Sequence, residues 1–400
     1  MLLLLLLPFL TSAEFLTPVL DQYHDDVALP DLCQDDTVIS CNLVQIDLAF
    51  LHNSTLVFSG TTLDFLDQPG DNTFTFSTED GDEASFTVDE ELGAVWGHAQ
   101  LANGRDFIIE PDLENCDRCH VVIEENQDAF PEDQSVTPRT SAGTRSNVAW
   151  TRKASTLLEK GMSDKTTVVT YSIKVYYTPE VKKSTPDIMA MVEQVIATTN
   201  QGYINSKIPL RVVLHCVEET EEPEDHFTSV NGLEPFRKYK GGGNSLRGSA
   251  DTAALLVTHL KGVCGIGYRL SYDAGNNYDE STLSMSRVDC AMAGYTFGHE
   301  LSHNFGNWHD KYQDGWREYA YAQGYHIPGS KFRTIMAYRR SQKPKNTLQI
   351  NYYSNPDVKI KKKRTGKNGK ADAARRITEA RFVIAAIGDE SEECHSTVSR

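Results

Sequence analysis

The chain has 400 residues and carries 39 lysines and arginines against 56 aspartates and glutamates, a net charge of −17. It contains no internal repeat, no P-loop and no G-x-S-x-G motif, so nucleotide chemistry, serine hydrolysis and a nucleic-acid partner have no support. After the first 13 residues no segment approaches 18 consecutive apolar residues, and we expect no membrane anchor.

The chain begins with an apolar stretch, "MLLLLLLPFLTSA", that ends in small residues. Such a stretch is typical of a secretory signal peptide and is too short to span a bilayer. We therefore expect cleavage after Ala13 and a secreted, extracellular protein. Eight cysteines and an acceptor sequon at Asn53, where we expect N-glycosylation, agree with an oxidising route of export.

Charge divides the chain into two units. Residues 1–153 hold 6 basic and 28 acidic residues, a net charge of −22, whereas residues 154–400 have a net charge of +5. The stretch around this boundary, Glu132–Thr156, is polar and dotted with basic residues, which predicts an exposed linker. We expect an acidic domain over residues 14–153 and a second domain over residues 154–400.

The acidic domain is predicted to be rich in β-strands. "TFTFSTEDGDEASFTVDE" alternates apolar and polar residues on either side of Asp80-Gly81, and "AVWGHAQLANGRDFIIEP" holds two apolar runs about Asn103-Gly104. Asp-Gly and Asn-Gly between such runs are typical of β-hairpins. This half shows no catalytic constellation, so its own role would be one of binding.

The second domain alternates predicted strands with helices. A strand, "TTVVTYSIKVYYT" (Thr166–Thr178), is followed by a helix of about 20 residues. A strand "LRVVLHCVEE" and a third apolar run, "TAALLVTHL", come next. This order predicts an α/β fold with a mixed, mostly parallel sheet flanked by helices. Residues 154–400 are enough to bury one large core.

Most of the candidate chemistry lies in "GHELSHNFGNWHD" (Gly298–Asp310). The overlapping segment Ala291–Phe305 has apolar residues at helical intervals and no proline, which predicts a buried helix. His299 and His303, four residues apart, would lie one turn above the other on one face and could bind a single ion. Nitrogen ligands of this kind favour Zn²⁺, so we expect one catalytic zinc ion as cofactor.

The residues that follow complete a candidate zinc site. Gly306 can take a positive φ, which would turn the chain out of the helix and let His309 fold back as the third ligand. Glu300 adjoins the first ligand, where a carboxylate can take a proton from water. A bare H-E-x-x-H arises by chance in about 2% of such chains, but two ordinary buried histidines would not explain Glu300 and Gly306. Other histidines, His98 and His326 among them, lack ligand spacing.

"HELSHNFGNWHD" resembles the long zinc signature of the metzincin metallopeptidases, H-E-x-x-H-x-x-G-x-x-H. The Asp310 that follows the third histidine resembles the adamalysin (reprolysin, ADAM-like) branch. "FRTIMAY" supplies Met336, which resembles the methionine that metzincins carry in a tight turn beneath the zinc. Most of residues 165–390 is similar to a reprolysin-type catalytic domain. The resemblance implies the α/β metzincin fold and a zinc endopeptidase.

The methionine turn departs from the adamalysin pattern. Adamalysins usually place a cysteine two residues before this methionine, where the chain has Thr334. The spacing of Met336 and Tyr338 instead resembles astacins and serralysins, in which the tyrosine can approach the zinc as an extra ligand. A buried Tyr338 that braces the turn is the alternative.

The resemblance also implies the reaction and its control. A secreted enzyme would hydrolyse peptide bonds of extracellular proteins with a zinc-activated water, Glu300 serving as general base. The run "DFIIEP…HVVIEE" resembles the reprolysin propeptide, so the protein would be made as a zymogen. Its own acidic domain would then be the inhibitor, docked through charge as well as shape. Cleavage near Arg152-Lys153 would release activity.

Cysteines supply two further candidate sites. Cys116 and Cys119 in the acidic half could place a thiolate on the zinc and so maintain latency, or could form disulfides. Cys264 and Cys290 flank a loop before the zinc helix and would close it as a disulfide.

Basic residues supply candidate binding sites. The run "KIKKKR" (Lys359–Arg364) could bind polyanions such as matrix glycosaminoglycans or be a solvated loop. Arg339 and Arg340 follow the methionine turn, where the resemblance to metzincins implies the wall of the pocket for the residue beyond the cut bond, and they indicate tolerance for acidic or polar side chains there. The alternative function is a secreted zinc-binding or matrix-binding protein that engages a partner without cleavage. The presence of Glu300 favours the enzyme.

Overall fold

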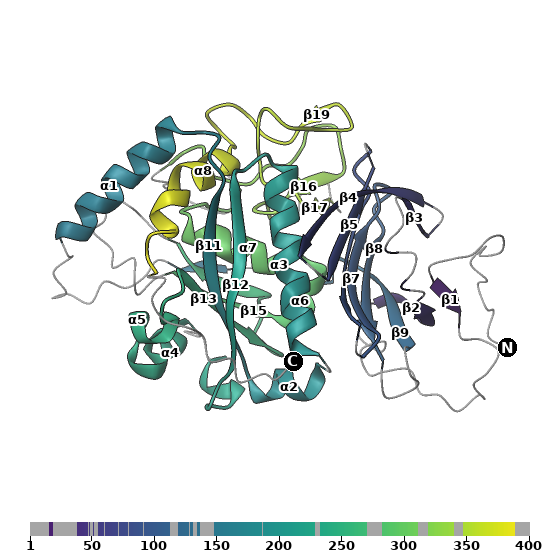
Figure 1. The fold of residues 1–400 in the computed structure, drawn as a ribbon. Coiled ribbons are helices and arrows are strands. Elements are labelled where there is room, and N and C mark those ends of the chain that lie inside the picture. Colours follow the sequence, from purple (N-terminus) through teal and green to yellow (C-terminus); the bar gives the residue numbers. More distant parts are fainter. Residues whose placement is uncertain are drawn as a thin grey trace.

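The computed structural model describes residues 16–18, 38–46, 48, 51, 55–59, 61–70, 72–78, 80–90, 92–112, 119–127, 129–130, 134–136, 148–185, 187–228, 233–269, 282–310, 319–339 and 347–388. Within them, each half of the chain forms a sheet, and helix α3 (Ile188–Asn205) lies between the two sheets (Figure 1). The expected cleavage after Ala13 and the positions Asn53, Cys116 and Arg340 lie outside the described residues. None of the described helices is long and apolar enough to cross a membrane.

The acidic half folds as a nine-stranded antiparallel sheet, in the order β1-β2-β9-β8-β7-β6-β5-β4-β3. Its strands are β1 Leu16–Pro18, β2 Val38–Ile46, β3 Thr55–Phe58, β4 Thr61–Gly70, β5 Thr73–Ser77, β6 Glu83–Asp89, β7 Ala94–Gln100, β8 Asp106–Pro111 and β9 Cys119–Glu125. Gly81 and Gly104, in the turns between β5 and β6 and between β7 and β8, take φ values of 92° and 102°. Both hairpins predicted from the sequence are thus confirmed.

The second half contains a six-stranded sheet in the order β10-β14-β15-β13-β11-β12. Its strands are β10 Gln134–Val136, β11 Val169–Tyr177, β12 Leu210–Glu219, β13 Thr252–Val257, β14 Gly265–Tyr268 and β15 Leu283–Arg287. The pairs among β11, β12, β13 and β15 are parallel, whereas β14 runs antiparallel to β15. This confirms the mixed, mostly parallel sheet. The end strand β10 comes from the acidic half and pairs parallel with β14.

Helices cover the second sheet, and short strands complete the fold. The helices are α1 Val148–Ser163, α2 Pro179–Ser184, α3, α4 Leu233–Lys238, α5 Gly243–Arg247, α6 Val288–Ala293, α7 Thr296–Asn304 and α8 Ala373–Ile384, with 3-10 turns η3 Glu224–His226 and η4 Tyr239–Gly241. The short pairs are β16 Phe332–Thr334 with β17 Leu348–Ile350, and β18 Lys359–Ile360 with β19 Lys363–Arg364.

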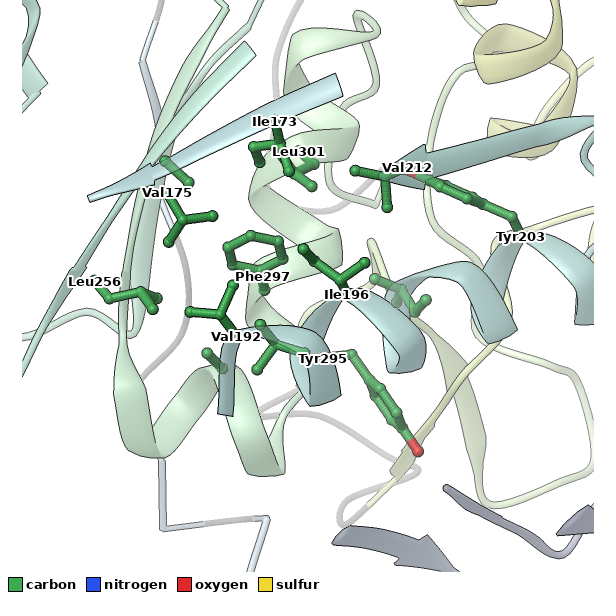
Figure 2. Close-up of a cluster of buried hydrophobic side chains, with 14 of the residues drawn as sticks. Ile173, Val175, Val192, Ile196, Tyr203, Val212, Leu256, Tyr295, Phe297 and Leu301 are labelled. Atoms are coloured by element: carbon green, nitrogen blue, oxygen red, sulfur yellow. The ribbon is translucent and has the colours of Figure 1, made fainter. Parts of the chain in front are cut away.

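The main core lies between the second sheet, α3 and α7. In Figure 2, Ile173 and Val175 from β11 face Val192 of α3 and Phe297 and Leu301 of α7. All of these side chains are buried. Because branched and aromatic side chains from three elements fill one space, the core fixes the position of α7 relative to the sheet.

Helix α3 is buried on both sides because the acidic half covers its outer face. Gln194 of α3 donates to Ser85 Oγ at 2.6 Å and accepts a hydrogen bond from Thr87 Oγ1 at 3.0 Å, both on β6. Gln194 and Thr87 have no solvent exposure. Polar side chains buried in this way need partners, and here each half supplies the partners of the other.

The helix predicted over Ala291–Phe305 is interrupted in the structure. α6 ends at Ala293, and α7 begins only at Thr296. Tyr295 between them takes a left-handed conformation, with φ at 55°. Its ring belongs to the main core, points toward the acidic half (Figure 2) and packs edge-on against His98 there, with ring centroids 5.2 Å apart. The helical spacing of apolar residues could not predict this break, because a contact with a strand distant in sequence stabilises it.

The exposed linker predicted over Glu132–Thr156 is wrong for its last residues. Residues 148–156 form the first part of α1, where Ala154 is buried. α1 lies beside α8 (Figure 1), so closely that a Cβ on Gly161 would lie 2.0 Å from the main-chain oxygen of Glu379. α1 therefore packs with the second domain. Charge composition alone could not show this, because the helix docks through small and apolar residues.

Candidate metal centre and active site

Three histidines converge at the end of α7. His299 and His303 lie one turn apart on the helix, and Gly306, with φ at 89°, turns the chain so that His309 returns toward them. The ligand atoms of the three rings all lie within 4.8 Å of one another, and Nε2 of His303 is 3.1 Å from Nε2 of His309. All three side chains are buried. The structure thus brings together the predicted metal ligands.

Main-chain carbonyls orient two of these rings. Nδ1 of His299 lies 2.9 Å from the oxygen of Ile335, and Nδ1 of His303 lies 2.8 Å from the oxygen of Asn307. A ring nitrogen beside a carbonyl oxygen carries the hydrogen, so Nε2 of each ring presents its lone pair. Burial, and then the neighbouring imidazoles of His309 and His299, hold the pKa of His303 well below its usual value. His303 is therefore neutral, the form that binds metals.

This donor set fits a tetrahedral metal ion. Zn–N distances of 2.0–2.1 Å and a tetrahedral angle place two ligand nitrogens about 3.3 Å apart. The separation of 3.1 Å between the Nε2 atoms of His303 and His309 is close to that value. Imidazole nitrogens suit zinc, and also copper, iron and nickel. The cluster is consistent with a metal site.

The carboxylate of Glu300 lies in a slot formed by strand β14. A Cβ placed on Gly265 would lie 2.7 Å from Glu300 Oε1, and one placed on Gly267 would lie 2.8 Å from Glu300 Oε2. Glu300 has no solvent exposure. The two glycines are therefore needed for the carboxylate to fit beside the metal ligands. Sequence reasoning missed them, although glycines spaced by two within a strand indicate a close approach.

The methionine turn lies beneath the histidines. Met336 is fully buried, and Ala337 N donates to Thr334 O at 2.9 Å to close the turn. Thr334, which stands where adamalysins usually have a cysteine, accepts a hydrogen bond on Oγ1 from Tyr325 N at 2.9 Å. A hydroxyl thus anchors this turn to the preceding segment.

Tyr338 lies against the metal ligands. Its ring stacks on that of His309, with centroids 4.0 Å apart, and is 6.3 Å from the ring of His299. The side chain is half-buried. Tyr338 therefore borders the site, and ligation of the zinc by its hydroxyl stays a prediction.

Asp310 holds the chain that follows the third ligand. Its Oδ2 lies 3.0 Å from Nε2 of His326, and both side chains are buried. Gly324 N also donates to the oxygen of His309 at 3.2 Å. His326 was expected to have no part in the site because it lacks ligand spacing, and its position shows a positioning contact instead. Only the fold brings it to Asp310, so no local pattern could have found it.

The predicted disulfide between Cys264 and Cys290 is present, with Cα atoms 5.6 Å apart. It joins the start of β14 to α6 and so ties the strand behind Glu300 to the helical segment before α7. Cys119 is also disulfide-bonded. A latency thiolate from Cys119 would therefore require that bond to be open.

The acidic half reaches the edge of this site. A small cavity of about 30 Å³ beside His299 is lined by Arg333 and Arg339 of the second half and by Gln127 and Phe130 of the acidic half.

The predicted basic run forms β18, β19 and the turn between them. In this turn, Lys361 Nζ donates to the oxygen of Ala102 at 3.2 Å. Polyanion binding by this run stays a prediction.

Known proteins resemble the second half of the chain. Residues 167–354 match the family model Reprolysin_5, metallo-peptidase family M12. A peptidyl-Asp metalloendopeptidase of Stenotrophomonas maltophilia is 30% identical over 212 residues, 50% of this chain and 48% of the relative. A peptidyl-Asp metalloendopeptidase of Xanthomonas campestris is 29% identical over 208 residues, 50% of this chain and 47% of the relative. The chain spans about half the length of these curated relatives.

Among solved structures, metalloproteinase-II from Bacteroides fragilis aligns with 71% of this chain and 87% of its own, at 12% identity and a TM-score of 0.42. The family match covers the segment that holds the histidine cluster. Together they support a metzincin-like metallopeptidase domain over residues 167–354.

Proposed function

We propose that the chain is a zinc-dependent metalloendopeptidase of the reprolysin-like metzincins. The observation that carries the proposal is the convergence of three buried imidazoles within 4.8 Å, two of them on the helix that also carries Glu300. His299, His303 and His309 would hold the zinc. When bound, zinc supplies a Lewis acid that polarises a carbonyl and lowers the pKa of water.

Glu300 is the general base in this proposal. Its carboxylate takes a proton from the attacking water and later delivers it to the leaving amine, so no covalent intermediate with the protein is needed. Gly265 and Gly267 leave the space in which the carboxylate lies. Strand β14, which carries them, becomes an edge strand once β10 leaves, and an extended peptide can add to such an edge.

We propose that the acidic half keeps the enzyme latent as a propeptide. Its strand β10 pairs with β14 and its residues Gln127 and Phe130 line the cavity beside His299. A substrate that pairs with β14 must displace this strand. Hydrogen bonds between neutral groups join the two halves, such as Gln100 Nε2 to the oxygen of Gln349 at 2.8 Å. These contacts support steric inhibition more directly than the attraction between net charges.

We further propose an acidic preference and an extracellular location. The relatives from two bacteria are peptidyl-Asp metalloendopeptidases, and an arginine lines the cavity beside His299 in this chain. The apolar start of the chain and the disulfide between Cys264 and Cys290 support secretion. Removal of the first 13 residues should then abolish export into the medium.

One experiment tests the peptidase. The full chain is nicked between β10 and α1, the acidic half is separated, and cleavage of a proteome-derived peptide library is measured with and without a chelator. Cleavage that the chelator abolishes and added zinc restores supports the proposal. A zinc-loaded protein that cleaves none of the peptides would favour the alternative, a zinc-binding protein that engages its partner without cleavage.

A further inference from the structure

The cavity beside His299 is bordered by two arginines. Thr296 and His299 come from α7, and Arg339 follows the methionine turn. Arg333 also lines the cavity, is buried and donates through Nη1 to the oxygen of Thr347. Two guanidinium groups next to one small cavity create a positive potential there.

In the full chain, Arg339 holds two oxygens of the acidic half. Its Nη1 donates to the main-chain oxygen of Gln127 at 3.0 Å, and its Nη2 donates to the main-chain oxygen of Phe130. One guanidinium thus holds two acceptor oxygens with its two terminal nitrogens. A carboxylate offers two oxygens to the same pair of donors, and with a negative charge it makes the stronger bonds.

Contacts with the second half fix these two carbonyls firmly at the cavity. Gln127 Oε1 accepts a hydrogen bond from Gln349 N at 2.9 Å, and Phe130 is buried in the main core of the second half. Arg339 is consequently occupied for as long as this segment is in place. Its donors become available to a substrate when the segment leaves.

We propose that Arg339 has two successive roles. In the latent chain it holds the segment Gln127–Phe130 of the acidic half. In the separated enzyme it binds the side-chain carboxylate of an aspartate or glutamate of the substrate, the residue that enters the cavity beside His299. Arg333 adds a second positive charge to the same cavity. This inference rests on the proposed peptidase activity and names the residue that selects its substrate.

Latency and substrate preference then both depend on the side chain of Arg339. A substitution that removes the guanidinium fork weakens selection of acidic residues and loosens the acidic half together. A merely structural arginine would not change the preference between two peptides that differ at a single position. The ratio of kcat/KM for two such peptides is therefore the decisive measurement.

The test compares Arg339→Gln, Arg339→Lys and Arg339→Glu with the wild type and with Arg237→Gln. Arg237 lies on α4 and pairs with Glu234 there, so it serves as the matched control. Each full chain is nicked and freed of its acidic half. Matched peptides with Asp, Asn or Lys directly after the cut bond are then assayed, and zinc content and melting temperature are recorded.

We expect the Asp-to-Asn ratio of kcat/KM to fall about tenfold or more in Arg339→Gln, because a charge-assisted pair is lost. In Arg339→Lys, which keeps the charge without the fork, the ratio should fall less. Arg339→Glu should cleave the Lys peptide in preference to the Asp peptide, and Arg237→Gln should have the same ratio as the wild type. Before nicking, the Arg339→Gln chain should also become active more readily, because its acidic half is held less firmly.

A wild type without preference for Asp over Asn, or an unchanged ratio in Arg339→Gln, would overturn the inference while leaving the peptidase proposal intact. If Arg339→Gln fails to retain zinc, the ratio measured for Arg339→Lys decides in its place. Absence of cleavage by a zinc-loaded wild type would instead reject the peptidase itself.

Discussion

His299 and Gln349 share one acceptor, the main-chain oxygen of Ile335, at 2.9 Å and 2.8 Å. Gln349 N in turn donates to Gln127 Oε1 of the acidic half at 2.9 Å. A candidate zinc ligand and a contact of the acidic half therefore lie on one short path of hydrogen bonds. The docking surface and the metal site are thus linked through Ile335 and Gln349, and this link guides the following predictions.

Replacement of the proposed base should separate metal binding from catalysis. We expect Glu300→Gln to bind zinc and to lose at least about 100-fold in kcat, in line with general-base contributions. Zinc content and peptide cleavage are measured on the same nicked preparation. Cleavage by Glu300→Gln at nearly the wild-type rate would show that another group takes the proton.

Removal of the third histidine should remove the metal. We expect His309→Ala to lower zinc affinity strongly, because His299 and His303 alone leave the site short of a ligand. Competition with a chelator of known affinity measures the loss. His259→Ala, at a histidine outside the cluster, is the control, and equal zinc affinity in both variants would remove His309 from the ligand set.

Substitution in the slot behind the base should displace its carboxylate. A methyl group at Gly267 would lie 2.8 Å from Glu300 Oε2 and 2.6 Å from Glu300 O, so Gly267→Ala should lower kcat. Gly262 has φ at 76° and no atom within 4 Å of its added Cβ. Gly262→Ala should therefore cost about 1 kcal/mol of stability through backbone strain without a comparable loss of kcat. Similar losses of kcat in both variants would contradict the role given to the slot.

A buried ionisable group at the interface should make docking depend on pH. Glu83 of β6 accepts a hydrogen bond from Asn205 of α3 at 2.7 Å, and burial raises its pKa to about 7. Nearby, His98 lies 2.7 Å from Asp106 and packs against Tyr295. Burial lowers the pKa of His98, but the attraction of Asp106 outweighs it, so the net shift of that pKa is upward.

The shift of Glu83 favours its protonated form in the docked state, because Glu83 lies buried against α3 of the second half. The contribution of Glu83 is fully present below its ordinary pKa of 4.5 and is lost as the pH rises to about 7. His98 adds nothing to this dependence, because Asp106, the cause of its upward shift, belongs to the acidic half itself. A nicked protein should thus release its acidic half more readily at pH 8 than at pH 5, measured by gel filtration. Glu83→Gln should reduce this difference, and greater release at pH 5 would contradict the prediction.

The position of the activating cut should follow the helix. Arg152 and Lys153 lie within α1, and Lys153 Nζ donates to the oxygen of Ala386 at 3.3 Å. A protease needs an extended chain, which disfavours a cut inside α1, so we expect productive cuts at Arg139 or Arg145, the basic residues that precede α1 in the sequence. Mass spectrometry of the trypsin-nicked protein locates the cut, and Arg152→Gln/Lys153→Gln should activate as fast as the wild type. Slower activation of that variant would show that the activating cut lies within α1.

Much of the fold and of the candidate site could be predicted from local sequence pattern. Residues four apart on a helix share a face, so His299 and His303 could be placed side by side from the sequence. Glycine tolerates a positive φ without strain, so the turn at Gly306 could be predicted as well. Alternation about Asp-Gly and Asn-Gly fixed two hairpins in the same way. These features depend on neighbours in the chain, which the sequence displays directly.

Tertiary structure alone decided the surroundings of that site. The break at Tyr295, the slot that Gly267 leaves for Glu300, the pairing of Asp310 with His326, and the hold of Arg339 on the acidic half all join segments that are distant in sequence. A local pattern carries no information on such pairs, because their energy arises from burial and hydrogen bonding that exist only once the sheets have packed around α3. The sequence by itself determined the candidate ligands, and the packed fold determined what surrounds them.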